Sequence, residues 1–309
     1  MLLAMNGNAH GSYREIPARP TLRFEPRHDA LVALDSDGCV MDTMAIKQRL
    51  CFHGEIARQW GLEAIEAEVR RVGEYVNLYS KWRGQHRFPA LLKIFDLLPT
   101  LEEVRVSGLP MPDTRGLRDY VESGVPLSHE SLQAACEQTN DPQLARVLAW
   151  SQAVNRNVEG IADRIRPFDG VRETLEFLQG HADLIVVTQT PTAAVRAEWA
   201  AHGLDRFVRF MAGPEFGSKA EALRAAAEGR YAPGRVLMVG DAPGDLKAAR
   251  EVAACFFPIL PGRESESWQR LREESFARFA EGGFDAEVQA ELVADFEALL
   301  PDTPPWVEG

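Results

Sequence analysis

Three short apolar runs along the chain each end in a polar residue. Runs of four or five consecutive apolar residues are typical of parallel strands that are buried on both faces. A proline follows soon after the second and third runs, at a position that suits the first turn of a helix. The pattern predicts strand–helix units of a parallel α/β sheet, with strands over residues 30–34, 184–187 and 236–239 that lead to Asp35, Thr188 and Asp241.

The long stretch between the first two strands has helical periodicity. Apolar residues recur at helical spacing in its first part, and Pro142 follows a capping aspartate at the start of another helix. Residues 106–127 are rich in glycine and proline and predict loops. We therefore expect an α-helical cap domain over residues 44–164, inserted into an α/β core formed by residues 1–43 and 165–309.

The two ends of the chain differ in character. Residues 1–29 carry three prolines and little periodicity, which predicts an irregular lead-in. A strand-like run at residues 255–257 is followed by two helical stripes of apolar residues, interrupted at Gly282-Gly283. We expect these two helices to extend the core.

Composition limits the class of protein. The 309 residues are enough for two domains at about 150 residues each, and 45% apolar with 26% charged residues is typical of globular chains. The 34 basic against 46 acidic residues give a net charge of −12, which disfavours nucleic acid as a partner. No apolar run is long enough for a membrane span or a signal-peptide core, so we expect a cytoplasmic protein without membrane contact.

Four carboxylates follow the predicted strands. Asp35 and Asp37 come after the first strand, and Asp241 and Asp245 come after the third, at the head of a helix. Because ligands of parallel α/β sheets bind beyond the carboxyl ends of the strands, these groups and Thr188 should share one crevice. Carboxylates this close need a cation, and oxygen ligands without histidine or cysteine favour Mg²⁺. Aspartate is also an ordinary turn and capping residue, so either pair alone has a structural alternative.

A lysine near the third strand adds to this pattern. Ser218 and Glu221 have the spacing of a capping box, which places Lys219 in the first turn of a helix. A cation opposes the helix dipole at that position. The position favours a lysine that faces an anion or the acidic cluster, with a solvated surface lysine as the alternative.

With these residues in this order, the chain resembles the haloacid dehalogenase superfamily. The resemblance is to its phosphatase and β-phosphoglucomutase-like branch, in which a helical cap is inserted directly after the first motif. It implies a Rossmann-like, doubly wound parallel sheet. The motifs that carry the resemblance are Asp35-x-Asp37-Gly38, Thr188, Lys219 and Gly240-Asp241-x-x-x-Asp245.

The resemblance also implies a role for each motif residue. Asp35 matches the nucleophile that forms an aspartyl-phosphate, and Asp37 matches the general acid and base. Thr188 matches the residue that holds a phosphoryl oxygen, and Lys219 matches the one that neutralises nucleophile and phosphate. The implied Mg²⁺ site comprises Asp35, the backbone carbonyl of Asp37, Asp241 and, as support, Asp245.

Substrate selection is expected from the cap. The segment around residues 77–88 concentrates basic side chains in an acidic protein, and Lys81, Arg83 and Arg87 are the candidates for binding a polar or anionic leaving group. Arg83 and Arg87 share a helix face only if Gly84 does not break the helix. The alternative is a solvated basic face with its aromatic residues packed inward.

The function that follows is Mg²⁺-dependent hydrolysis of a phosphomonoester on a small phosphorylated metabolite. A phosphosugar mutase of the β-phosphoglucomutase type uses the same residues and is the first alternative. A non-enzymatic phosphoacceptor or ligand-binding module on the same fold is the second. Asp37 argues against that module, because a slowly hydrolysing phosphoaspartate does not need a resident acid and base.

Overall fold

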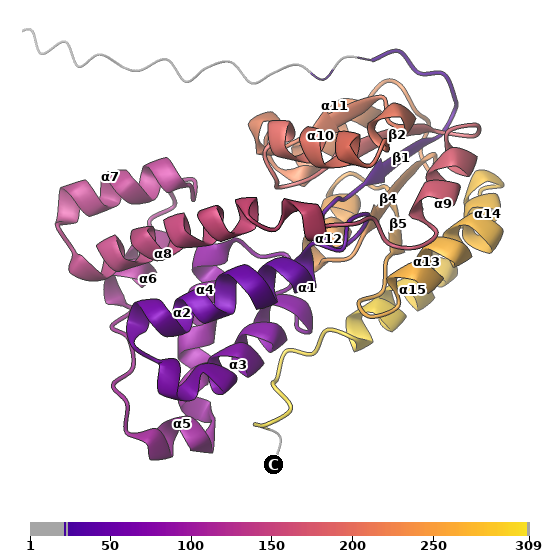
Figure 1. The fold of residues 1–309 in the computed structure, drawn as a ribbon. Coiled ribbons are helices and arrows are strands. Elements are labelled where there is room, and N and C mark those ends of the chain that lie inside the picture. The colour runs from indigo at the N-terminus through magenta and orange to yellow at the C-terminus, as the bar shows by residue number, and fades with distance from the viewer. Residues whose placement is uncertain (1–21, 23, 308–309) are drawn as a thin grey trace, which may run out of the picture.

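A parallel five-stranded sheet forms the centre of the computed structural model, which describes residues 22 and 24–307 (Figure 1). The strand order is β3-β2-β1-β4-β5. The parallel α/β fold expected from the sequence is confirmed. Most of the expected lead-in, residues 1–29, lies outside the described residues. The strands are β1 (Leu31–Leu34), β2 (Asp183–Val187), β3 (Phe210–Ala212), β4 (Val236–Gly240) and β5 (Cys255–Pro258).

Both faces of the sheet are buried, which explains why its strands lack a polar–apolar alternation. Val32 and Leu34 of β1 face one hydrophobic core, and Leu31 and Ala33 face the other. The edge strand β3 was not predicted, because three residues are too few for a recognisable pattern.

Helices cover both faces of the sheet, as a doubly wound fold requires. On the face of Val32, the core includes side chains of α9 (Val171–Leu178), α10 (Thr192–Ala201), α13 (Glu264–Arg270) and α14 (Phe276–Ala280). On the face of Leu31, it includes α11 (Lys219–Ala227) and α12 (Pro243–Glu251). α15 (Ala286–Ala298) contributes to both cores and packs beside β5. The two predicted C-terminal helical segments are present, with α13 and α14 joined by a π-helical stretch over Leu271–Ser275.

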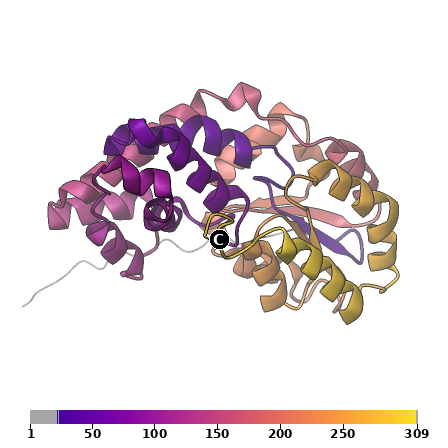
Figure 2. The same cartoon turned by 90° about the horizontal axis from the view of Figure 1, so that it is seen from below.

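The helices between β1 and α9 form a second body, here called the helical insert (residues 44–164), with its own hydrophobic core (Figures 1 and 2). A helix, α6 (Arg115–Glu122), lies inside the stretch 106–127 for which the sequence predicts loops. That prediction is wrong there because Leu117 and Tyr120 are buried in the core of the insert, and this packing supports a short helix between glycines and prolines. The insert contains α1 (Met44–Lys47), a π-helical stretch (Gln48–Phe52), α2 (His53–Trp60), α3 (Glu66–Leu78), α4 (Arg87–Leu97), α5 (Glu102–Ser107), α6 (Arg115–Glu122), α7 (His129–Thr139) and α8 (Pro142–Glu159).

The C-terminal tail connects the core to the insert. After α15 the chain runs toward α3, as the yellow tail in Figure 1 shows. The hydroxyl of Tyr75 donates a hydrogen bond of 3.0 Å to the carbonyl of Pro301, and the Tyr75 and Trp306 rings meet edge to face at 5.2 Å. The guanidinium of Arg71 lies 5.0 Å from the centre of the Trp306 ring. The tail therefore adds contacts between the two bodies.

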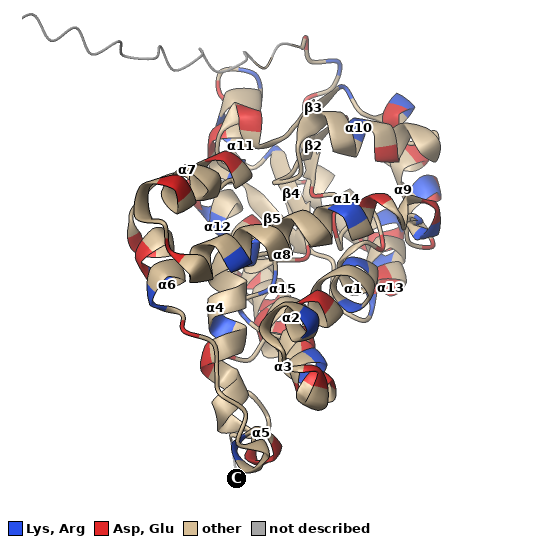
Figure 3. Cartoon of the chain, turned by 60° about the vertical axis from the view of Figure 1, so that its left-hand side comes forward, with Lys and Arg blue, Asp and Glu red and all other residues tan. Residues whose placement is uncertain are grey.

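Acidic and basic residues are interspersed along the helices of both bodies (Figure 3). None of the helices in the described part of the chain combines the length and apolar character that crossing a bilayer demands.

Candidate active site

Three neighbouring strands end at the polar residues singled out in the sequence. β1, β2 and β4 lie side by side in parallel, so their carboxyl ends open at one edge of the sheet. Asp35, Thr188 and Asp241 directly follow these ends, and all three are buried. The strand order reverses at β1, which is the position in an open α/β sheet where a ligand crevice forms.

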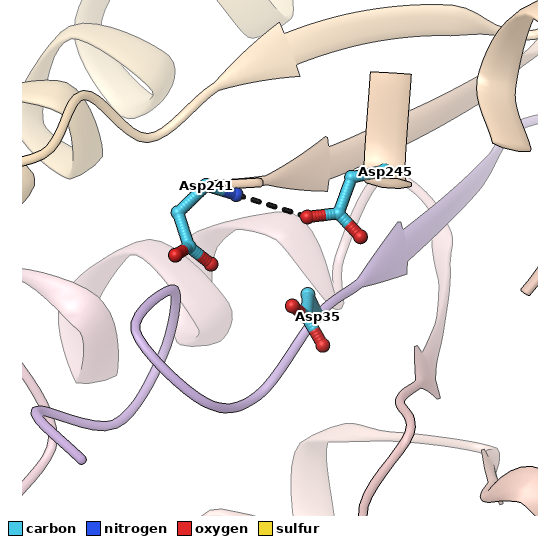
Figure 4. Close-up of side chains that lie close together, drawn as sticks. All are labelled: Asp35, Asp241 and Asp245. Atoms are coloured by element: carbon cyan, nitrogen blue, oxygen red, sulfur yellow. Dashed lines mark hydrogen bonds between the residues drawn. The ribbon is translucent and has the colours of Figure 1, made fainter. Parts of the chain in front are cut away.

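Three carboxylates meet at this edge (Figure 4). Asp35, Asp241 and Asp245 each offer an oxygen atom, and these oxygens lie within 4.8 Å of one another. The first turn of α12 supplies Asp245, whose Oδ2 accepts hydrogen bonds from the backbone N–H groups of Asp241 (3.2 Å) and Ala242 (3.0 Å). A Cβ on Gly240 would lie 2.4 Å from Asp245, so this close approach requires glycine.

Lys219 lies between two of the three carboxylates. Its Nζ is 2.8 Å from Oδ2 of Asp35 and 2.6 Å from Oδ1 of Asp245. Ser218 and Glu221 form the capping box that starts α11, and the lysine in its first turn faces the acidic cluster. Burial would lower the pKa of Lys219, but the two aspartates outweigh burial and raise it, so the lysine is charged.

Burial controls the protonation of Asp35. Its removal from water raises its pKa well above the ordinary value, Lys219 lowers it, and the charges of Asp245 and Asp241 raise it again. An additional cation at the site would favour the ionised carboxylate that a nucleophile requires.

Asp241 is held by an arginine from the insert. The Nη2 and Nε atoms of Arg83 lie 2.7 and 2.8 Å from its Oδ2, and Nε also donates to its carbonyl at 3.0 Å. Burial raises the pKa of Asp241 to about 6 against the lowering effect of Arg83. A Cβ on Gly38, whose φ is +79°, would come within 2.6 Å of the same Asp241 oxygen, so the loop after β1 also needs glycine here.

The donor set fits a hard divalent cation. Oδ1 of Asp241 is buried and has no hydrogen-bond partner among the described residues. Such an orphaned oxygen is costly unless a ligand satisfies it. When all three carboxyl groups are ionised, as bound to a cation, they exceed the two cations Lys219 and Arg83 by one negative charge, and oxygen-only ligands match Mg²⁺.

Asp37 points away from the acidic cluster. Its Oδ1 lies 2.7 Å from Nζ of Lys47 in α1, and its Oδ2 accepts a hydrogen bond from the hydroxyl of Thr190. Burial would raise the pKa of Asp37, but Lys47 and these hydrogen bonds lower it below the ordinary value. The backbone N–H of Thr190 also donates to Oγ1 of Thr188 at 3.1 Å, so one residue contacts both predicted site residues.

Two of the three predicted basic residues of the insert lie away from the carboxylates. Gly84 has a φ of +76° and ends the turn that carries Arg83, and α4 begins only at Arg87. Arg83 and Arg87 therefore do not share a helix face. Arg87 lies within the insert and donates to Oγ of Ser151 at 3.0 Å, whereas Lys81 pairs with the exposed Asp302 of the tail.

Sequence reasoning missed further groups beside the site. Thr190 follows the predicted Thr188 by only two residues, and this closeness to a predicted site residue is a signal that could have identified it. Lys47 and Glu198 gave none, because each lies on a helix whose orientation is set by packing. Nζ of Lys47 lies 4.0 Å from Glu198, and burial raises the pKa of Glu198 to about 7 against the effect of Lys47.

The chain has relatives among known proteins. The family model of haloacid dehalogenase-like hydrolases matches residues 30–253. No curated protein sequence matches the chain. Similar solved structures include a haloacid dehalogenase-like hydrolase from Streptococcus pneumoniae, with 16% identity, a TM-score of 0.41, and 78% of this chain and 90% of that chain covered. A predicted phosphoglycolate phosphatase from Haemophilus somnus has 17% identity, a TM-score of 0.40, and coverage of 74% and 84%.

Proposed function

The chain belongs to the haloacid dehalogenase-like hydrolases, and we propose that within this family it is a Mg²⁺-dependent phosphomonoester hydrolase for a small phosphorylated metabolite. The observation that carries this proposal is the buried cluster of Asp35, Asp241, Asp245 and Lys219, with an unpartnered Asp241 oxygen. Phosphoryl transfer needs in-line positioning and neutralised oxygens more than it needs further chemistry.

In the first step, an oxygen of Asp35 attacks phosphorus and the bond from phosphorus to the leaving alkoxide breaks. Asp37 gives its proton to the leaving oxygen, and Asp35 becomes an aspartyl-phosphate. Lys219, 2.8 Å from Asp35, stabilises the negative charge on the transferring group. The hydroxyl of Thr188 holds a phosphoryl oxygen.

In the second step, water attacks the phosphorus of the aspartyl-phosphate while Asp37 accepts its proton. The bond between phosphorus and Asp35 breaks, which releases inorganic phosphate and restores the carboxylate. Asp37 pairs with Lys47 and Thr190, an arrangement that favours its ionised form. We therefore propose that substrate displaces these contacts when Asp37 acts as an acid.

Asp35, Asp241, Asp245 and the backbone carbonyl of Asp37 are the groups that would hold Mg²⁺. The ion when bound supplies positive charge that neutralises phosphoryl oxygens. The orphaned Oδ1 of Asp241 supports this assignment.

We propose that the helical insert serves as the cap of the site and that Arg83 is the cation it contributes to the acidic cluster, beside Lys47 at Asp37. Arg83 is buried against Asp241, whereas Lys81 and Arg87 have partners elsewhere. Cap contacts would then select the leaving group, and loss of Lys81 or Arg87 would leave substrate preference unchanged.

The test is release of inorganic phosphate from a panel of phosphorylated sugars, polyols, nucleotides and acids, with Mg²⁺ or with EDTA. We expect Mg²⁺-dependent release from a narrow set of substrates and none from the Asp35→Asn protein. Release that persists in EDTA or in Asp35→Asn would contradict the proposed chemistry. A mutase would instead need a sugar bisphosphate in the same assay to convert a sugar phosphate into its isomer.

A further inference from the structure

The loop that follows β1 is tightly wound around one carbonyl group. The carbonyl of Ser36 accepts hydrogen bonds from the backbone N–H groups of Cys39 (3.3 Å), Val40 (3.0 Å) and Met41 (2.9 Å). The loop carries Asp35 and Asp37 at its start, so its conformation sets where both carboxylates point.

Two tryptophans from distant helices donate hydrogen bonds to this loop. Nε1 of Trp199 in α10 donates to Oγ of Ser36 at 2.9 Å, and Nε1 of Trp268 in α13 donates to the carbonyl of Cys39 at 2.9 Å. Both indole rings are fully buried. Neither tryptophan belongs to the sequence motifs that identify the site, yet both contact the loop that carries Asp35 and Asp37.

The position of Trp268 is itself fixed by the core. The hydroxyl oxygen of Thr174 in α9 lies 2.7 Å from the carbonyl of Gly170 and 3.2 Å from that of Trp268, so the two carbonyls share its single hydrogen. A Cβ on Gly170 would lie 3.7 Å from that of Trp268. The helix that carries Trp268 lies in the C-terminal extension, which gives this extension a connection to the loop.

A third buried tryptophan shows that these bonds are not a general consequence of burial. Trp150 in the helical insert is 1% exposed, and its Nε1 has no partner among the residues that the structure describes. In contrast, the indole N–H groups of Trp199 and Trp268 both have acceptors, and both acceptors belong to the loop after β1. Residues that orient catalytic groups in this way are usually sensitive to substitution.

We propose that Trp199 and Trp268 are positioning residues, which fix the loop carrying Asp35 and Asp37 through their indole N–H groups. This inference rests on the proposed function for its effect on turnover. Removal of either N–H leaves a buried acceptor unpaired, and the loop relaxes away from the geometry that aligns nucleophile and acid.

The experiment replaces each tryptophan by phenylalanine, which keeps an aromatic ring and removes the donor. Trp150→Phe is the matched control, because it removes a buried N–H that has no partner among the described residues. Turnover of 4-nitrophenyl phosphate with Mg²⁺ is measured with amide hydrogen exchange over residues 36–41. We expect Trp199→Phe and Trp268→Phe to lower kcat about 10- to 100-fold with little change in KM, and to speed exchange in the loop. Trp150→Phe should change neither.

Ser36→Ala provides a second route that leaves the core rings intact. It removes the acceptor of Trp199, so its effect on kcat and that of Trp199→Phe should not add in the double variant. Additive effects, or tryptophan variants that match Trp150→Phe in both kcat and exchange, would overturn the inference. If the unmodified protein releases no phosphate from any substrate, the proposed function fails, and loop exchange alone then decides the role of the tryptophans.

Discussion

The α/β core and the helical insert both bury a hydrophobic core, but they treat buried charge differently. In the core, Asp35, Asp241 and Asp245 are concentrated at the carboxyl ends of the strands. Arg83 of the insert is the only lysine or arginine among the described residues with less than a tenth of its surface exposed. It contacts Asp241 of the core.

The difference shows that the two bodies contribute unequally to the site. The core supplies an excess of buried negative charge, and the insert supplies the buried Arg83 to Asp241 and the partly exposed Lys47 to Asp37. Buried ions are expensive unless they are paired, so neither set is stable without a partner. Electrostatics therefore link the insert to the core at the same point where chemistry is proposed.

Replacing Asp35 by Asn should produce the largest effect. Without a carboxylate nucleophile, turnover should fall by about 10⁴-fold or more, because no aspartyl-phosphate forms. The matched control is Asp183→Asn, which changes a buried aspartate of the same sheet that caps the N–H groups of Arg27 and His28. Asp183→Asn should lower the unfolding free energy while leaving kcat within a few-fold. A comparable loss of turnover in both proteins would show that Asp35, after the carboxyl end of β1, has no catalytic role that Asp183, at the start of β2, lacks. Phosphate release and urea unfolding measure the two effects.

Replacing Arg83 by Gln tests the link between insert and core. In EDTA this change should lower the unfolding free energy by about 3–5 kcal/mol, because it leaves Asp241 without its partner. Mg²⁺ should reduce this deficit by supplying positive charge at the same carboxylates. Arg87→Gln is the control within the insert, with a deficit of about 1–3 kcal/mol that should not respond to Mg²⁺. Urea unfolding with and without Mg²⁺ measures these losses of unfolding free energy. If Arg83→Gln loses the same amount in both conditions, Arg83 and Mg²⁺ do not act on the same carboxylates, and the proposed electrostatic link between insert and core is wrong.

Acid should destabilise the insert through His53. Its burial, with Arg70 and Arg49 nearby, lowers its pKa from 6.5 to about 3. The unfolded chain therefore binds a proton before the folded chain does, and stability is lost as pH falls from about 6.5 toward 3. At pH 5 the loss from this group is about 2 kcal/mol relative to pH 7. His53→Leu should remove this part of the pH dependence in urea unfolding at pH 7 and pH 5. An unchanged difference between the two pH values would show that His53 is not its source.

The C-terminal tail should give the smallest effect. Trp306→Ala removes the edge-to-face contact with Tyr75 and the cation–π contact with Arg71, which together should be worth about 1–2 kcal/mol. Lys81→Ala breaks only an exposed ion pair with Asp302 and should cost less than about 0.5 kcal/mol. Thermal unfolding compares the two proteins. Equal midpoints for Trp306→Ala and the unmodified chain would mean that the tail does not stabilise the insert against the core.

The residues that the α/β core contributes to the site were predictable because they directly follow the ends of buried strands. An apolar run identifies a buried strand, and parallel strands bring the residues that follow them to one edge. For this reason the amino-acid sequence alone was enough to group Asp35, Thr188 and Asp241. The helical periodicity of the insert was also readable, although α6 depended on burial of Leu117 and Tyr120 and was missed.

The insert side of the site was less predictable. Basic residues close together in sequence suggested one recognition surface, but a left-handed Gly84 turned Arg83 and Arg87 in different directions. Lys47 and the two loop-contacting tryptophans carried no clear signal, because the packing of their helices, rather than their spacing in the sequence, brings them to Asp37 and to the loop.

The sequence by itself determined the parallel sheet, the helical character of the insert and the set of carboxylates with their lysine. Those features follow from local periodicity and from the common direction of parallel strands. Only the tertiary structure decided which insert cation reaches Asp241, which partners hold Asp37, and which indoles contact the loop. The reason is physical: a hydrogen bond or ion pair between distant elements depends on how helices pack, and packing is set by the whole core rather than by neighbouring residues.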